Sequence, residues 1–429
     1  MRRPESRAES ATMSEPVREH DIVVYGASGF VGVLVAQHLA EHAPAGTRIA
    51  LAGRSAAKLA DVNRRLGVDW PILLAEATDD AALERLATSA RVMLTTVGPY
   101  AKYGRPLVRA CAVAGTHYVD LTGEVLFVRA SIDENDAVAR SSGARIVHSC
   151  GFDSVPSDLG VHVLHAAVAA DGAGELTDAT MVVTSIRAGI SGGTVDSMRN
   201  QLDVVRTDRR LRRIAASPYS LSPDRSAEAD LGRQDDMATV RGDTVDPALR
   251  GTLAPFVMAS YNTRVVRRSN ALRDWAYGRR FRYRELMSVG TSPLSGLVAA
   301  GTKLGLGALV AGLMLPPTRF VLDRLLPKPG EGPGEKARRE GHFTMDFFAT
   351  TTTGARYRAR FRAQGDPGYV ATAVMLGESA LALVHDRDAL PPGGGGVLTP
   401  ATALGDALVS RLRAAGMEIS SRRLEPVSG

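Results

Sequence analysis

Residues 23–34 read VVYGASGFVGVL, and this stretch predicts the fold of the N-terminal half of the chain. The apolar run that precedes its glycines, residues 21–25, is typical of a short buried strand. Residues 30–38 follow the glycines with the apolar spacing of a helix face. The turn between strand and helix carries three glycines, spaced three residues apart: Gly26, Gly29 and Gly32. This turn therefore needs backbone that is free of side chains.

The glycine spacing is close to the dinucleotide-binding fingerprint Gly-x-Gly-x-x-Gly, which also lies between a strand and a helix. The first glycine allows the tight turn, the second lets backbone N–H groups approach a pyrophosphate, and the third lets the helix pack on the strand. The helix N-terminus adds its partial positive charge. A purely structural turn is the alternative, which the strand and helix on either side make less favourable. We predict cofactor contacts from Gly26, Ser28, Gly29, Phe30 and Gly32.

The end of the second strand indicates which dinucleotide binds. Residues 47–52 (TRIALA) are mostly apolar and lead into Gly53, Arg54 and Ser55, with Lys58 one helical turn later. NAD enzymes usually place an acidic residue there for the ribose hydroxyls. A guanidinium, a hydroxyl and an ammonium instead suit a 2′-phosphate. A solvated basic helix start is the alternative, and we predict NADP(H) held by Arg54, Ser55 and Lys58.

Strands and helices continue to alternate after this point. We expect strands at 71–76, 91–96, 117–121 and 144–148, and helices at 80–89, 105–114 and 132–141. This order predicts an α/β fold with a doubly wound parallel sheet, whose ligands lie at the carboxyl ends of the strands. Residues at such ends are predicted to contact the cofactor: Thr96, Gly98, Pro99 and Asp120. Ordinary turn chemistry is the alternative for each of them.

The chain of 429 residues is long enough for two or three domains. Its two cysteines, Cys111 and Cys150, form no disulfide framework and lack the neighbours of a zinc site. We therefore expect no metal and a reducing, cytoplasmic location. Residues 1–18 are polar, without the apolar core of a secretory signal, and are expected to be a disordered tail. Met13 is an alternative start.

Several motifs, taken in order, resemble one family. They are GASGFVG (26–32), AGR (52–54), TTVGPY (95–100), YVDLTGE (118–124) and CGFDSVPSD (150–158). Together they are similar to the saccharopine dehydrogenase-like oxidoreductases, and most of all to the actinobacterial branch of trans-acting enoyl reductases. The similarity continues through SGGT (191–194), APFVMASYNTRVVRRS (254–269) and YGRRFRYRE (277–285).

The resemblance implies a Rossmann NADP-binding domain over residues 19–156 and a second α+β domain over 157–385 for substrate binding or dimerisation. Residues 386–429 would form a linker and a C-terminal helix that packs back on the Rossmann domain. The branch acts beside polyketide synthases in making complex lipids. It therefore implies reduction of a carbon–carbon double bond in an acyl or polyketide chain, with a carrier protein or a synthase as partner and a homodimer as one assembly.

Enoyl reduction needs a hydride at the β carbon and a proton at the α carbon, and the protein has to position both. Tyr100 follows a strand end and is our first candidate for the proton donor. Asp153 and Ser154, in the segment that joins the two domains, come next. Tyr100 packing on the cofactor and Asp153–Ser154 capping the next helix are the alternatives.

Basic residues gather at 206–213 (RTDRRLRR) and between 264 and 284. An acidic carrier domain or anionic lipid headgroups suit such a surface, and a solvated basic surface is the alternative. We expect no nucleic acid, because no nucleic-acid motif accompanies these residues.

Residues 289–318 carry one charge, Lys303, in a long apolar segment. Three structures are consistent with it: a buried helix pair between domains, a surface segment that contacts the plasma membrane or an acyl chain, or a membrane-spanning helix.

Two other functions stay open from the sequence. The first is a saccharopine dehydrogenase-like enzyme that acts on an amino-acid or imine substrate. The second is a nucleotide-binding scaffold at the membrane, without catalysis.

Overall fold

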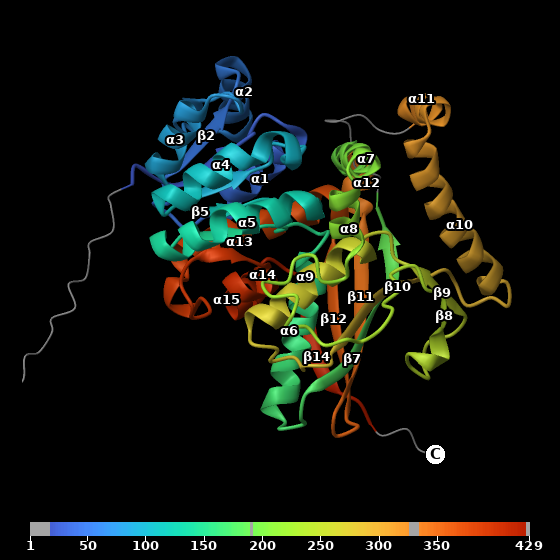
Figure 1. Cartoon of the computed structure of the whole chain (residues 1–429). Helices are drawn as coiled ribbons and strands as arrows, with labels where there is room; N and C mark the ends of the chain where they lie inside the picture. The colour runs from blue at the N-terminus through green and yellow to red at the C-terminus, as the bar shows by residue number, and fades with distance from the viewer. Residues whose placement is uncertain (1–17, 189–191, 326–333, 426–429) are drawn as a thin grey trace, which may run out of the picture.

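The computed structural model describes residues 18–188, 192–325 and 334–425, so the predicted tail at 1–18 lies almost entirely outside the described residues. The first of two sheets holds seven parallel strands in the order β13-β6-β5-β4-β1-β2-β3. Most of this sheet lies in the blue to teal part of the ribbon in Figure 1. Their bounds are β1 His20–Tyr25, β2 Ile49–Gly53, β3 Ile72–Leu74, β4 Ala90–Thr95, β5 His117–Val119, β6 Arg145–Val147 and β13 Gly396–Leu398. The predicted doubly wound sheet is confirmed.

Strand β1 is buried along its whole length because helices cover both faces of this sheet. Ile22 and Val24 face one core and Val23 and Tyr25 face the other, as the two-residue period of a strand requires. Helices on the first face are α1 Phe30–His42, α2 Ala56–Leu66 and α13 Thr372–His385. Helices on the second face are α3 Asp80–Ser89, α4 Tyr100–Ala114 and α5 Val125–Ser142.

The second sheet is mixed, in the order β14-β12-β11-β7-β10-β9-β8. Its strands are β7 Leu176–Arg187, β8 Val240–Arg241, β9 Thr252–Pro255, β10 Arg282–Ser288, β11 His342–Thr351, β12 Arg356–Gln364 and β14 Glu418–Arg423. In β12, Tyr357, Ala359 and Phe361 are buried under α6 (Val155–Ala170), as the alternating pattern predicts. Two arginines on the opposite face, Arg358 and Arg360, pair with Asp346.

The C-terminal segment, predicted as a linker and one helix, contains more structure than that. Helices α14 (Pro400–Ala403) and α15 (Gly405–Ala414) lie between β13 and β14. Strand β13 extends the first sheet beside β6, whereas β14 extends the second sheet beside β12. The end of the chain therefore joins both sheets, and the predicted domain boundaries at 156 and 385 stay predictions.

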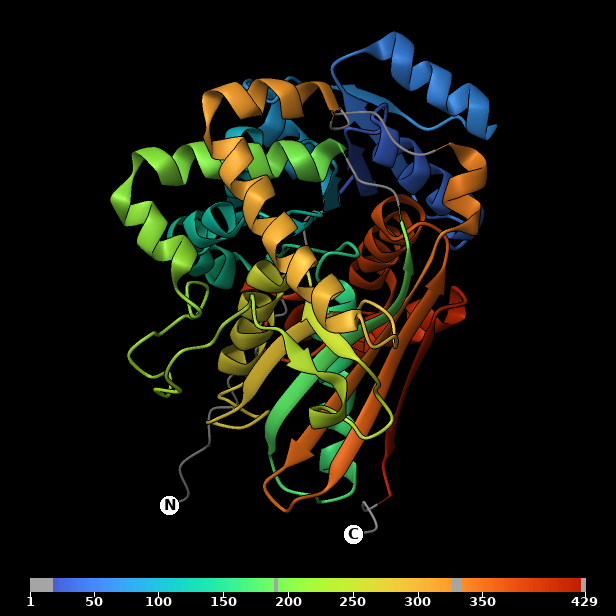
Figure 2. The same cartoon turned by 90° about the vertical axis from the view of Figure 1, so that its right-hand side faces the viewer.

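The helices between β7 and β11 lie beside the carboxyl ends of the first sheet. They are α7 Gly192–Thr207, α8 Arg209–Ala216, α9 Ala259–Leu272, α10 Ser295–Met314, α11 Pro316–Leu325 and α12 Glu335–Glu340. Figure 2 shows α10 crossing the front of this side of the molecule, with α11 above it and α7 behind it. Within the described residues, two helices are long and apolar enough to span a membrane by length and composition. The one that includes α13 is 83% buried, whereas α10 is only 11% buried.

Of the three structures that the sequence leaves open for 289–318, the buried helix pair is therefore wrong for α10. The basic surface expected at 264–284 is also wrong for three of its arginines. Arg264, Arg267 and Arg268 are buried and donate to backbone carbonyls, among them Ala215, Pro218 and Leu221. These guanidinium groups fix the 215–221 segment on α9, because a buried arginine needs acceptors for its N–H groups.

Candidate functional site

A cleft of about 730 Å³ lies at the carboxyl ends of β1, β4 and β5, where the Rossmann sheet faces the second domain. It begins at the glycine turn with Gly29 and Phe30, passes Asp153, and ends against Leu306 and Leu309 of α10. Ligands of open parallel sheets bind at this position. The cleft therefore connects the predicted cofactor turn with the apolar helix that crosses the front of Figure 2.

The glycine turn has the geometry that a dinucleotide requires. Gly26 has φ +89°, and a side chain there would collide with Thr96 and Val97. A Cβ on Gly32 would collide with the Gly26 carbonyl, so α1 packs directly on the turn. No side chain caps α1, which begins after Gly29, and its first N–H groups are left for a ligand. Ser28 is half-buried in the turn, and Phe30 packs on Tyr369 with ring centroids 4.8 Å apart.

Helix α4, which follows the neighbouring strand β4, differs from α1 in this respect. The Glu124 carboxylate accepts hydrogen bonds from the backbone N–H groups of Tyr100 and Ala101, both at 2.9 Å. Ser197 of α7 donates to the same carboxylate at 2.8 Å. The side chain thus satisfies the N-terminus of α4, although burial raises the pKa of Glu124. Of these two helix starts, only that of α1 is left for a pyrophosphate.

The predicted phosphate-binding residues lie together just after β2. Arg54 and Lys58 are exposed and have no carboxylate partner among the residues that the structure describes. Ser55 caps α2 by accepting a hydrogen bond from the Lys58 N–H at 3.4 Å. Because β2 pairs with β1, both cations lie beside the glycine turn. Their contact with a 2′-phosphate stays a prediction that this placement supports.

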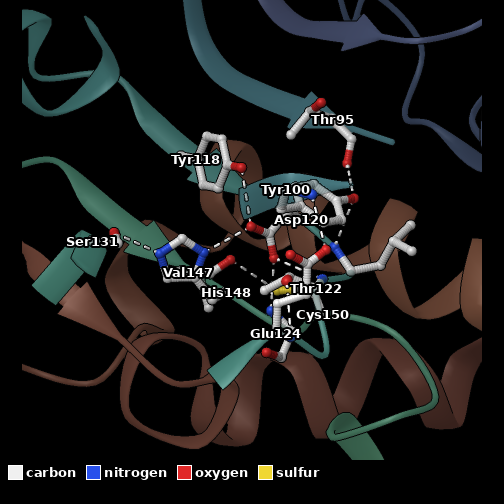
Figure 3. Close-up of polar contacts among 12 residues, drawn as sticks. Thr95, Tyr100, Tyr118, Asp120, Thr122, Glu124, Ser131, Val147, His148 and Cys150 are labelled. Carbon is white, nitrogen blue, oxygen red and sulfur yellow. Dashed lines mark hydrogen bonds and ion pairs between the residues drawn. The ribbon is translucent and has the colours of Figure 1, made fainter. Parts of the chain in front are cut away.

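The strand-end residues divide into two groups. Thr96, Gly98 and Pro99 line the cleft, and Thr96 Oγ1 donates to the Gly26 carbonyl at 3.2 Å. Asp120 is fully buried and does not line the cleft. Figure 3 shows Tyr118 and His148 turned towards its carboxylate.

Neighbouring groups occupy the Asp120 carboxylate completely. Tyr118 donates to Oδ2 at 3.0 Å, and His148 Nδ1 lies 2.7 Å from the same atom (Figure 3). The backbone N–H groups of Thr122 and Ser149 donate to Oδ1 at 3.1 and 2.9 Å. This arrangement ties the ends of β5 and β6 together. A cofactor contact from Asp120 stays untested, and its geometry favours a structural role.

Tyr100, the first candidate for the proton donor, begins α4 and lines the cleft with part of its ring. Its hydroxyl donates to the Thr95 carbonyl at 3.1 Å and accepts from the Leu121 N–H at 3.4 Å (Figure 3). Burial, with the Asp120 carboxylate nearby, raises the pKa of Tyr100 well above its ordinary value. Backbone partners therefore hold this proton, and the geometry favours packing over proton donation.

Asp153 is in the opposite situation. It lines the cleft, its carboxylate approaches Gly123, and it accepts no hydrogen bond from the described residues. Burial raises the pKa of its carboxyl to about 6. A carboxylic acid with that pKa, free of partners and facing a cleft, has the properties of a general acid.

The loop that carries Asp153 is fixed by α9 on both sides. Tyr261 shares a short hydrogen bond with Ser149, and Ser154 Oγ donates to Asn262 Oδ1 at 3.1 Å. Phe152 N donates to Thr372 Oγ1 at 3.0 Å. Ser154 is fully buried, so its hydroxyl positions the loop. Sequence reasoning missed Tyr261, which lines the cleft from α9, because no local pattern separates it from the core residues around it.

The cleft carries few charges. Asp153 and Asp196 are the acidic residues that line it, and none of the described lining residues is a lysine, arginine or histidine. In the part of the chain that the structure describes, no group of acidic, histidine or cysteine side chains could hold a metal ion. The cleft therefore suits an uncharged apolar chain, because a free carboxylate would find no cationic partner there.

Comparisons with known proteins agree with this geometry. The family model of the saccharopine dehydrogenase NADP binding domain matches residues 22–147. Trans-acting enoyl reductases of Mycobacterium ulcerans and Mycobacterium tuberculosis (strain H37Rv) are each 49% identical to the chain, over 96% of its length and 100% of theirs. A second protein of that strain, 52% identical over the same shares, carries the same name provisionally.

The solved structure of saccharopine dehydrogenase (L-Glu forming) from Saccharomyces cerevisiae covers 95% of this chain and 100% of its own. The TM-score is 0.53 at 13% identity, which is a likeness of fold alone.

Proposed function

The chain belongs to the family of trans-acting enoyl reductases, and from that premise we propose that it reduces the α,β double bond of a long acyl or polyketide chain made by a separate synthase. It is an NADP-dependent oxidoreductase whose residues 22–147 match the saccharopine dehydrogenase NADP binding domain. The proposal extends this activity to a substrate class and assigns roles to residues.

The observation that carries the proposal is the cleft itself. One end meets the glycine turn, and the other is walled by apolar residues of α10, including Leu306, Leu309 and Val310. Its described lining offers no cation for the carboxylate of an amino acid. This favours an uncharged acyl thioester over the amino-acid or imine substrates of the alternative function.

NADPH, when bound at the turn, supplies the hydride. The chain's own residues would hold it: Gly26, Gly29 and Gly32 would let the backbone approach the pyrophosphate, and Arg54 and Lys58, beside the glycine turn, would bind the 2′-phosphate. The glycine turn fits this group because a side chain at Gly26 or Gly32 would collide with the turn.

Asp153 holds the proton for the α carbon on its carboxyl oxygen. The pKa of about 6 leaves a protonated fraction near neutral pH. Tyr261, which lines the cleft from α9 and shares a short hydrogen bond with Ser149, would hold the loop that carries Asp153 in place. The apolar residues of α10 that line the cleft would keep water away from the acyl chain of the substrate.

The trans-acting name of the relatives implies a separate polyketide synthase, and we propose a carrier-bound substrate for the same reason. A homodimer and a cytoplasmic location remain predictions that the described residues leave open.

The proposal is tested by incubating the purified protein with NADPH and enoyl thioesters of increasing acyl-chain length, and by measuring NADPH consumption and the thioester product. We expect loss of NADPH absorbance and a saturated thioester by mass spectrometry, with kcat/KM rising with chain length. A separate titration of NADPH binding, without substrate, distinguishes an inactive cleft from a missing cofactor. Reduction of a keto acid plus amine, with every enoyl thioester left intact, would instead establish the amino-acid or imine function.

A further inference from the structure

Helix α10 has an outer face that no described residue covers. Ser295, Ala299, Leu306, Leu309 and Leu313 face the body of the protein. The residues about half a turn away, facing solvent, are Leu297, Ala300, Leu304, Ala311 and Leu315. Leu297 and Leu304 are each 73% exposed. A surface helix of a soluble protein normally places polar side chains on this face, and an all-apolar face needs a partner.

The outer face is continuous over the length of the helix. At 1.5 Å per residue, Leu297 and Leu315 lie about 27 Å apart along the axis. The surface extends onto α11, where Phe320 is 59% exposed and the Arg324 guanidinium stacks over its ring at 4.1 Å. We call this surface, from Leu297 to Phe320, the α10–α11 ridge.

Both ends of α10 are attached to the same body of the protein. At its start, Ser295 Oγ accepts a hydrogen bond from Thr252 N at 3.0 Å. At its end, Arg206 of α7 donates to the Met314 carbonyl at 3.1 Å, and Arg319 pairs with Asp203. A helix held in this way cannot cross a bilayer, so the membrane-spanning structure is incompatible with these contacts. It can lie flat on one.

Cations lie on one flank of the ridge and on the neighbouring helix α8. Lys303 is on its flank, and Arg209, Arg210 and Arg213 of α8 follow α7 beyond the C-terminal end of α10. None of these four has a carboxylate partner among the described residues. Two copies of the chain meeting at this ridge would bring their cations close together, whereas an anionic lipid surface would neutralise them.

We propose that the α10–α11 ridge docks on an anionic membrane surface, with its leucines in the acyl boundary and its cations at the headgroups. The inner side of α10 lines the cleft through Leu306, Leu309 and Val310. Docking would therefore hold the apolar end of the cleft against the bilayer. This inference does not depend on the proposed reaction.

Vesicle flotation of the full chain tests the proposal. The probes are vesicles of pure phosphatidylcholine and vesicles of an equimolar mixture with phosphatidylglycerol. We expect the protein to float with the mixed vesicles only, and raised salt to weaken the binding. The double variant Leu297→Gln, Leu304→Gln should lose roughly tenfold in affinity per leucine. Lys303→Gln should bind the mixed vesicles with roughly fivefold lower affinity, because one cation near an anionic membrane surface contributes about that factor.

The matched control is Leu74→Gln, an equally drastic change at an exposed leucine of the Rossmann sheet. It should float like the wild type, and NADPH binding should be the same in all variants. No flotation with the mixed vesicles overturns the proposal, as does equal flotation of the double leucine variant. A dimer in solution that the double variant dissociates, without flotation, would assign the ridge to a second copy of the chain instead.

Discussion

Asp120 and Asp153 both follow strands of the Rossmann sheet, and the sequence proposes both for the site, but their surroundings are opposite. Asp120 is fully buried and accepts hydrogen bonds from a tyrosine and two backbone N–H groups, with a histidine at 2.7 Å. Asp153 is half-buried, faces the cleft and accepts none from the described residues. A carboxylate whose oxygens already accept hydrogen bonds from the protein stabilises the fold. A carboxylate that accepts none can take up a proton and transfer it to a substrate.

The largest effect is expected from Asp120→Ala. Removing this carboxylate leaves His148 and two buried N–H groups without their acceptor, and the free energy of unfolding should fall by about 3–5 kcal/mol. Urea unfolding measures it. Asp61→Ala, which breaks exposed ion pairs with Arg64 and Arg65, is the control and should cost less than about 1 kcal/mol. Equal losses in the two variants would contradict a structural role for Asp120.

Asp153→Asn should lower kcat for an enoyl thioester by about 10²–10⁴-fold, because the amide cannot supply the proton. NADPH affinity should not change, since the residue is not in the glycine turn. Asp196→Asn, at the other acid that lines the cleft, is the matched control and should leave kcat close to wild type. An Asp153→Asn enzyme with normal kcat would remove this residue from the mechanism.

The same substitution should change how stability depends on pH. Burial raises the pKa of Asp153 from 3.8 to about 6, so its protonated form is favoured in the folded state. Its contribution to stability is fully present below about pH 4 and is lost as pH rises through about 6, a change of about 3 kcal/mol. Asp153→Asn should therefore be the more stable protein above pH 6. Thermal unfolding of both proteins across this range measures the difference, and parallel curves would contradict the raised pKa.

Arg54→Ala should weaken NADPH binding by about tenfold and leave NADH binding unchanged, because we propose that the exposed guanidinium contacts only the 2′-phosphate. Titration of both nucleotides measures the ratio. Arg64→Ala, at the far end of α2, is the control. An equal loss for the two nucleotides would place Arg54 elsewhere in the cofactor site.

The smallest effect is expected from Tyr100→Phe. The variant loses the hydrogen bond to the Thr95 carbonyl and the long one from the Leu121 N–H, together worth about 1 kcal/mol of stability, and should keep its kcat. A loss of kcat comparable with that of Asp153→Asn would restore Tyr100 as the proton donor.

The glycine turn and the order of the Rossmann elements could be predicted because each rests on local pattern: glycine spacing, an apolar strand and a helix period. The C-terminal strands could not, because β13 and β14 gain their pairing from strands far away in sequence. Composition also could not separate α10 from α13, since both are apolar and only tertiary contacts bury one of them.

The site was predicted only in part for a similar reason. Residue types at strand ends predicted where the site lies. Whether the Asp120 carboxylate or the Tyr100 hydroxyl can contact a ligand depends on the hydrogen-bond partners that occupy it, such as His148 and the Thr95 carbonyl. The buried arginines of α9 show the same limit, because their acceptors are backbone carbonyls that no side-chain pattern reveals.

The pH dependence of kcat for a long-chain enoyl thioester, measured for the wild type and Asp153→Asn, tests the central claim most directly. The account predicts that the wild-type rate falls as pH rises above about 6, the pKa of the Asp153 carboxyl, and that the variant is slower, without this fall. A variant with the wild-type rate and profile, or a wild type that reduces no enoyl thioester at any pH, would contradict it.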